Sequence, residues 1–117
     1  MAETDNDLDR DAIRKEFAEI VNMSPTEIER WLDTSESREV GWTEDGAHES
    51  VGHKSGRRIV EIRRKKVADL DDDDFRHMRK VIGYARRHLA QGGPDEDAEH
   101  SRWRYSLMNW GHDPLKA

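Results

Sequence analysis

Apolar side chains recur every three or four residues over the first part of the chain, which is the spacing of one face of an α-helix. In the first such segment, Asp7–Val21, the apolar residues share one side and Asp and Arg occupy the other. The next segment has the clearest start signal: Ser24 can cap a helix, Pro25 suits its first position, and Glu27 completes a capping box. We therefore expect two amphipathic helices before residue 34.

The apolar repeat stops between Thr34 and Ser55, where Gly, Ser, Glu and His are frequent. We interpret this stretch as a long loop, anchored by Val40, Trp42 and Val51. A third helix is expected from Gly56 to about Ala68, with Ser55 as its cap. Its apolar arc consists of Ile59, Val60, Ile62 and Val67.

A fourth helix follows a short break at Asp69–Leu70, and its apolar residues are spaced three and four apart. Asp71–Asp74 give it an acidic start, and Gly92–Gly93–Pro94 end it. A fifth helix is expected over roughly Ala98–Asn109. The residues expected in the core are Phe17, Trp31, Ile59, Ile62, Phe75, Met78, Ile82, Leu89, Trp103, Leu107 and Trp110. The pattern predicts an all-α fold, a small single-domain bundle of four or five helices with a long loop before the third.

Length and composition narrow the class of protein. A chain of 117 residues fits one domain, and the absence of cysteine excludes disulfides, thiol catalysis and cysteine-ligated zinc. We divide the chain into an acidic flexible N-terminus (1–11), a helical domain (12–114) and a tail (115–117). The N-terminus lacks the apolar core of a signal peptide, and no apolar run approaches the ~18 residues of a membrane span. We expect a cytoplasmic protein that does not bind membranes.

The net charge of −6 conceals an uneven distribution. Residues 1–50 contain 15 acidic and 5 basic side chains, residues 51–90 contain 6 acidic and 12 basic, and residues 91–117 contain 5 acidic and 3 basic. Such asymmetry indicates an electrostatic partner, either within the chain or outside it.

Catalytic and metal-binding patterns are weak. No two of the six histidines are three or four residues apart, so we expect no local metal-ligand pair. Asp71–Asp74 lacks the glycine and the distal glutamate of a calcium loop, and helix capping explains the run better. Tyr105, Ser106, His112 and Asp113 offer hydrolytic groups, but no nucleophile-elbow pattern surrounds the serine. We therefore expect no catalytic residue, no metal and no cofactor.

The strongest functional signal is the group of cations on the third and fourth expected helices. Arginine matches phosphate geometry, and such a group can neutralise a nucleic-acid backbone. The candidate residues are Arg57, Arg58, Arg63, Arg64, Lys65, Lys66, Arg76, Arg79, Lys80, Arg86 and Arg87. The third helix is the better candidate for contact, because the fourth would present Asp71–Asp74 to the phosphates. Two alternatives stay open: the cations pair with the acidic first half of the same chain, or they bind an acidic protein.

Three segments resemble a family of short bacterial and fungal proteins. They are Ser50–Ile62, then Arg79–Tyr84 with Arg87–Gln91, and Arg102–Pro114, the last of which contains the block Ser-Leu-Met-Asn-Trp-Gly-His-Asp-Pro. The family is catalogued as a domain of unknown function, and some members carry a DNA-binding label. The resemblance covers most of the chain from Phe17 onward. It implies no catalytic residue, substrate or cofactor.

The expected function is therefore that of a non-enzymatic nucleic-acid-associated module whose partner is DNA or RNA. The alternative is an interaction or accessory protein that uses its basic face for an acidic partner. The oligomeric state and any base specificity are left open by the sequence.

Overall fold

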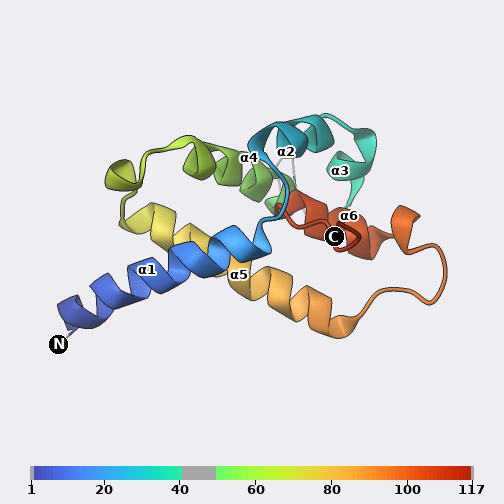
Figure 1. The fold of residues 1–117 in the computed structure, drawn as a ribbon. Helices are drawn as coiled ribbons and strands as arrows, with labels where there is room; N and C mark the ends of the chain where they lie inside the picture. The colour runs from blue at the N-terminus through green and yellow to red at the C-terminus, as the bar shows by residue number, and fades with distance from the viewer. Residues whose placement is uncertain (1, 41–49, 117) are drawn as a thin grey trace.

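A computed structural model describes residues 2–40 and 50–116, with side chains from Arg10 onward. Within these residues every regular element is a helix, which confirms the predicted all-α fold. The two longest helices, α1 (Ala2–Ile20) and α5 (Asp72–Gln91), pack along each other (Figure 1). A second pair lies beside them, in which α2 (Pro25–Leu32) packs on α4 (Val51–Arg64).

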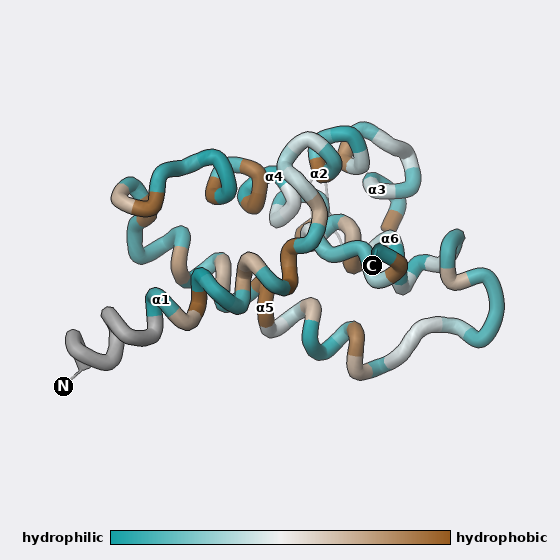
Figure 2. Tube along the Cα trace, in the orientation of Figure 1, coloured by the Kyte–Doolittle hydropathy of each residue, from teal (hydrophilic) through white to brown (hydrophobic). Residues whose placement is uncertain are grey.

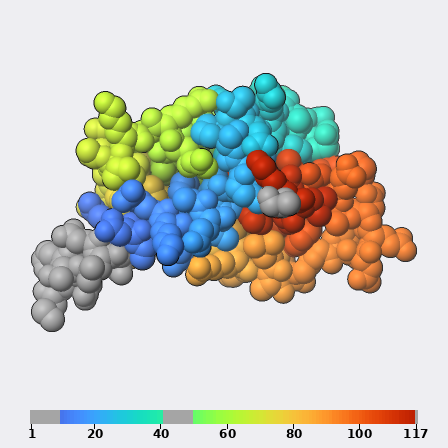
Figure 3. All heavy atoms as spheres, viewed as in Figure 1, coloured from blue at the N-terminus to red at the C-terminus, as the bar shows by residue number. Residues whose placement is uncertain are grey.

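The last helix joins the two pairs. It is α6 (Arg102–Asn109), which contacts α2, α4, α5 and the short α3 (Ser35–Glu39). Apolar residues from all these helices except α3 form the buried core. Figure 2 shows the hydrophobic segments of the chain in brown, alternating with hydrophilic ones along the helices. Side chains of α5 reach the surface along the edge below α1 in the space-filling view (Figure 3). One side of α5 is thus buried by the bundle and the other faces outward.

Several helix boundaries confirm the start and stop signals. The capping box of Ser24 and Glu27 is formed, and Asp71 and Asp74 form a second one at the start of α5. Gly92 ends α5 with φ +79°, a backbone conformation that L side chains rarely adopt. The second capping box thus marks where α5 begins and Gly92 where it ends.

The boundary of the third expected helix was wrong. This helix, α4, begins at Val51 with Ser50 as its cap, five residues before the predicted start, and it ends at Arg64. Ser55, the predicted cap, is buried inside the helix. Because the helix ends early, Val67 belongs to a 3-10 turn, η1 (Val67–Asp69), and is 56% exposed instead of buried.

The expected long loop is shorter than predicted, since it contains α3 and the first turn of α4. Residues 41–49, which include Trp42 and His48, lie outside the described residues. At the N-terminus, α1 runs back to Ala2 and therefore includes most of the segment that we set apart as residues 1–11.

The fifth expected helix is divided. A 3-10 turn, η2 (Ala98–His100), precedes α6, and Ser101 caps α6 by accepting a hydrogen bond from the backbone N–H of Arg104. Of the eleven predicted core residues, nine are buried, whereas Leu89 and Trp103 are only half-buried. Both lie near the end of α5, where the Trp103 indole donates to the backbone carbonyl of His88.

Candidate nucleic-acid interface

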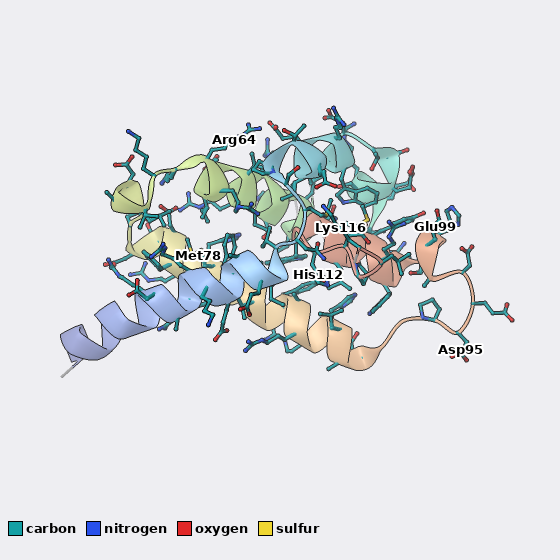
Figure 4. The ribbon with its side chains drawn as sticks, in the orientation of Figure 1. Arg64, Met78, Asp95, Glu99, His112 and Lys116 are labelled. Atoms are coloured by element: carbon teal, nitrogen blue, oxygen red, sulfur yellow. The ribbon has the colours of Figure 1, made fainter. Side chains whose placement is uncertain are left out.

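The eleven predicted site residues fall into two groups in space. The first, here called the α4 end, consists of Arg57, Arg58, Arg63, Arg64, Lys65 and Lys66. The second, here called the α5 face, consists of Arg76, Arg79, Lys80, Arg86 and Arg87. The side-chain view in Figure 4 shows Arg64 on the α4 side of the molecule, away from α5. The two groups differ in what their side chains contact.

The α4 end is held by one buried carboxylate. Asp74, whose side chain is fully buried, accepts from the Arg58 Nη2 at 2.7 Å and from the Lys65 Nζ at 2.8 Å. Burial alone would raise the pKa of Asp74, but the Lys65 ammonium, the Asp71 backbone N–H and the Arg58 guanidinium together lower it. Asp74 therefore remains ionised and ties the end of α4 to the start of α5.

Two further cations of the α4 end contact α2 and the turn before it. The Arg63 Nη1 donates to the backbone carbonyls of Val21 and Met23, both at 3.3 Å. The guanidinium of Arg64 forms a two-point pair with Glu29, at 2.5 and 3.1 Å. Pairing with the acidic first half of the chain, which the sequence left open, thus occurs at Arg64, and it occurs again on the α5 face, where Arg86 pairs with Glu16.

The α5 face is a continuous arc. At 100° per residue, its five cations occupy roughly a third of the helix circumference, opposite the buried Met78 and Ala85. Gly83 lies within the arc, and the Arg87 guanidinium lies across it, 3.1 Å from where a Cβ would be. The acidic residues of α5 are confined to its first turn.

Two cations of the α5 face pair with exposed carboxylates. Arg86 pairs with Glu16 at 2.9 Å, and the side chains are 60% and 40% exposed. Arg76 pairs with Asp73 one turn earlier, and both side chains are about three-quarters exposed. Exposed pairs of this kind contribute only about 0–1 kcal/mol, because water and salt screen them.

A row of stacked rings runs along the arc. His77 stacks on Trp110 with a centroid distance of 6.2 Å, Trp110 stacks on Tyr84 at 4.3 Å, and Tyr84 stacks on His88 at 5.2 Å. Lys80 lies over the Trp110 ring, 6.0 Å from its centroid. Burial, together with the nearby Lys80 and Arg58, lowers the pKa of His77, so its ring is neutral at pH 7.

A small pocket opens where α4, α5 and α6 meet beside this row. It has a volume of about 240 Å³. Its lining consists of Val51, Gly52, Lys80, Tyr84, Arg87, Ser106, Asn109 and Trp110. Two cations of the α5 face are thus also part of a pocket with largely aromatic and aliphatic walls. The sequence could not reveal this pocket, because its lining comes from three segments.

The groups suspected of hydrolytic chemistry are used in separate contacts. Ser106 hydrogen-bonds to Tyr84, and the Nδ1 of His112 is 2.6 Å from the backbone carbonyl of Ile20. Asp113 accepts two hydrogen bonds from the Arg104 guanidinium, which lowers the pKa of Asp113. In the described part of the chain, no three His, Asp or Glu side chains gather where they could hold a metal ion.

Comparison with known proteins gives a family but no activity. A model of the family described as "Protein of unknown function (DUF3140)" matches residues 16–108, which is most of the chain. The chain belongs to this family. No curated protein and no solved structure matches the chain. Among the described residues, the helices are too short or too polar to cross a bilayer.

Proposed function

We propose that this member of the family is a non-enzymatic module that holds the phosphate backbone of DNA or RNA against the α5 face. The observation that carries the proposal is the single-sign arc from Arg76 to Arg87. It extends over about 16 Å of helix at 1.5 Å per residue. Four of its five members are arginines, whose planar forks fit phosphate oxygens.

The exposed partners of the α5 face also support the proposal. A phosphate can replace the carboxylate of Asp73 or Glu16 without uncovering a buried charge. Replacing Asp74 at Arg58 would instead leave a fully buried carboxylate with one partner fewer. At the α4 end, Arg64 and Glu29 are as exposed as the pairs of the α5 face, at 51% and 49%. The proposal places the contact on the fourth expected helix because its five cations share one arc and neither Asp73 nor Glu16 is buried. The acidic start of α5, which argued against that helix, lies at one end of the arc, and Asp74 points inward.

The test is a titration of labelled single-stranded and duplex oligonucleotides by fluorescence anisotropy at about 50 mM salt, where phosphate contacts are strong. The double variant Lys80→Glu and Arg87→Glu should bind at least about tenfold more weakly than the original protein. Its slope of log affinity against log salt on duplex DNA should fall by about 1.8, or about 0.9 for each phosphate that the protein no longer neutralises.

A matched control reverses the same number of charges elsewhere. Arg30 and Arg38 are exposed residues of α2 and α3, outside the α5 face. The double variant Arg30→Glu and Arg38→Glu changes the net charge by the same amount and should retain most of the affinity. Equal losses in the two variants, or no binding by the original protein, contradict the proposal. The second outcome leaves an acidic protein as the alternative partner of the basic face.

A further inference from the structure

The pocket between α4, α5 and α6 adjoins the proposed phosphate track and shares Lys80 and Arg87 with it. Its volume of about 240 Å³ lies below the roughly 300–1,000 Å³ of ordinary small-molecule sites. A cavity of this size suits one small ring system. The two cations belong to the rim of the same pocket, one turn before and one turn after Tyr84.

We propose that this pocket receives one unpaired base of a single-stranded nucleic acid while the flanking phosphates lie on Lys80 and Arg87. The inference rests on the proposed function of the α5 face and specifies its partner. Single-strand binders commonly combine a cationic track with aromatic side chains next to it. Here the aromatic walls are Tyr84 and Trp110, which also line the pocket.

The walls of the pocket are preformed. Trp110 and Tyr84 stack on each other at 4.3 Å, and His77 and His88 extend the row on either side. Because the ring faces are used within this row, the base fills the pocket and does not intercalate between the rings. Gly52 closes one wall, since a Cβ there would lie 3.1 Å from the Trp110 Nε1.

The polar groups of the lining favour recognition of any base over a particular one. Asn109 is committed internally: its Oδ1 accepts from the Trp31 indole and the Ser37 hydroxyl, and its Nδ2 donates to the Ser37 carbonyl. The Ser106 hydroxyl is engaged with Tyr84. Because few polar groups are directed at the ligand, the pocket does not select one base over another. It selects an unpaired base over a paired one, because a paired base must first leave its duplex stack.

The experiment compares three probes of about 12 nucleotides, a length within the site sizes of single-strand binders. They are a mixed-sequence single strand, the same strand as a duplex, and an abasic strand that keeps the phosphates. The original protein should bind the single strand about five- to tenfold more tightly than the abasic strand, because the abasic strand leaves the apolar walls of the pocket in contact with water. The variant Val51→Phe, which fills the pocket and leaves both cations in place, should bind these two probes equally.

A second variant, Ser106→Leu, narrows the pocket from α6 and keeps the test valid if Val51→Phe does not fold. Unchanged affinity for the abasic strand shows that the phosphate track is intact in either variant. If the original protein binds all three probes equally and neither variant changes this, the base pocket is refuted while the α5 phosphate track stands. If no probe binds, the proposed function itself is refuted, and the base pocket with it.

Discussion

Arg58 and Arg87 carry the same charge on two helices of one small bundle, yet their surroundings differ. Arg58 donates to Asp74, a carboxylate with no exposed surface. Arg87 lies across Gly83 at the rim of an open pocket. The number of cations on a helix therefore says little about binding. A cation that pairs with a buried carboxylate is part of the fold, because leaving that buried charge unpaired costs several kcal/mol. A cation that pairs with an exposed carboxylate is available to a partner, because the exposed pair contributes little.

The largest expected effect is the difference in stability between charge reversal at Arg58 and charge reversal at Arg87. Arg58→Glu should lower the free energy of unfolding by about 3 kcal/mol, because it places a second carboxylate against buried Asp74. Arg87→Glu makes the same charge change on the exposed face and should alter stability by less than about 0.5 kcal/mol. Urea denaturation followed by circular dichroism measures both. Similar losses would show that the α5 face is as structural as the α4 end.

The next prediction concerns pH at the α4 end. The pKa of Asp74 is lower in the folded chain than its usual value of 3.8, so its ionised form stabilises the fold above pH 4. That stability should be lost as the pH falls below about 4 and Asp74 takes up a proton. Asp74→Asn removes the charge and should cost about 2 kcal/mol at pH 7, where hydrogen bonds to a charged group are lost.

The difference between Asp74→Asn and the original protein should therefore shrink steadily below pH 4. Denaturant melts at a series of pH values give this difference directly. A difference that stays constant down to pH 2 would mean that Asp74 contributes through packing and not through its charge. The α5 face offers a control, because Asp73 is exposed and replacing it by Asn should change the free energy of unfolding at pH 7 by less than about 1 kcal/mol.

The helices were predictable from sequence wherever local chemistry decides a boundary. The Ser24–Glu27 capping box and the Asp71–Asp74 start were confirmed because cap and capped N–H lie three residues apart. The start of α4 was missed because Gly52 was interpreted as a loop residue and Gly56 as the first residue of the helix. Both glycines are buried inside α4, where a Cβ on Gly56 would be 2.7 Å from the Asn109 carbonyl oxygen. Glycine here permits close helix packing and does not interrupt the helix.

The sequence predicted which cations belong to the candidate site, but not that they separate into the α4 end and the α5 face. The link from Asp74 to Arg58 spans 16 positions and the link to Lys65 spans 9, and neither follows a helical repeat. An acidic run at a helix start is fully explained by capping, so the sequence contains no further signal of a buried partner. The α5 face, by contrast, follows from the helical repeat alone, since Arg76, Lys80 and Arg87 are separated by four and seven residues.

The smallest expected effect tests whether phosphate can replace the exposed carboxylates that pair with the α5 face. Glu16→Gln and Asp73→Asn together remove the carboxylates that face Arg86 and Arg76. Because each exposed pair contributes little, the double variant should change the free energy of unfolding by less than about 1 kcal/mol.

If nucleic acid binds this face, phosphates no longer compete with the two carboxylates, and affinity at about 50 mM salt should rise about two- to threefold. The gain should shrink as salt is added, since screening weakens the competition that the carboxylates exert in the original protein. Anisotropy titrations over a salt series measure it, and Glu29→Gln is compared with Glu16→Gln alone as the matched control, since Glu29 faces Arg64 at the α4 end. An equal gain from the control would move the phosphate track to α4, and a loss of affinity in the double variant would show that Glu16 and Asp73 orient the arginines for binding.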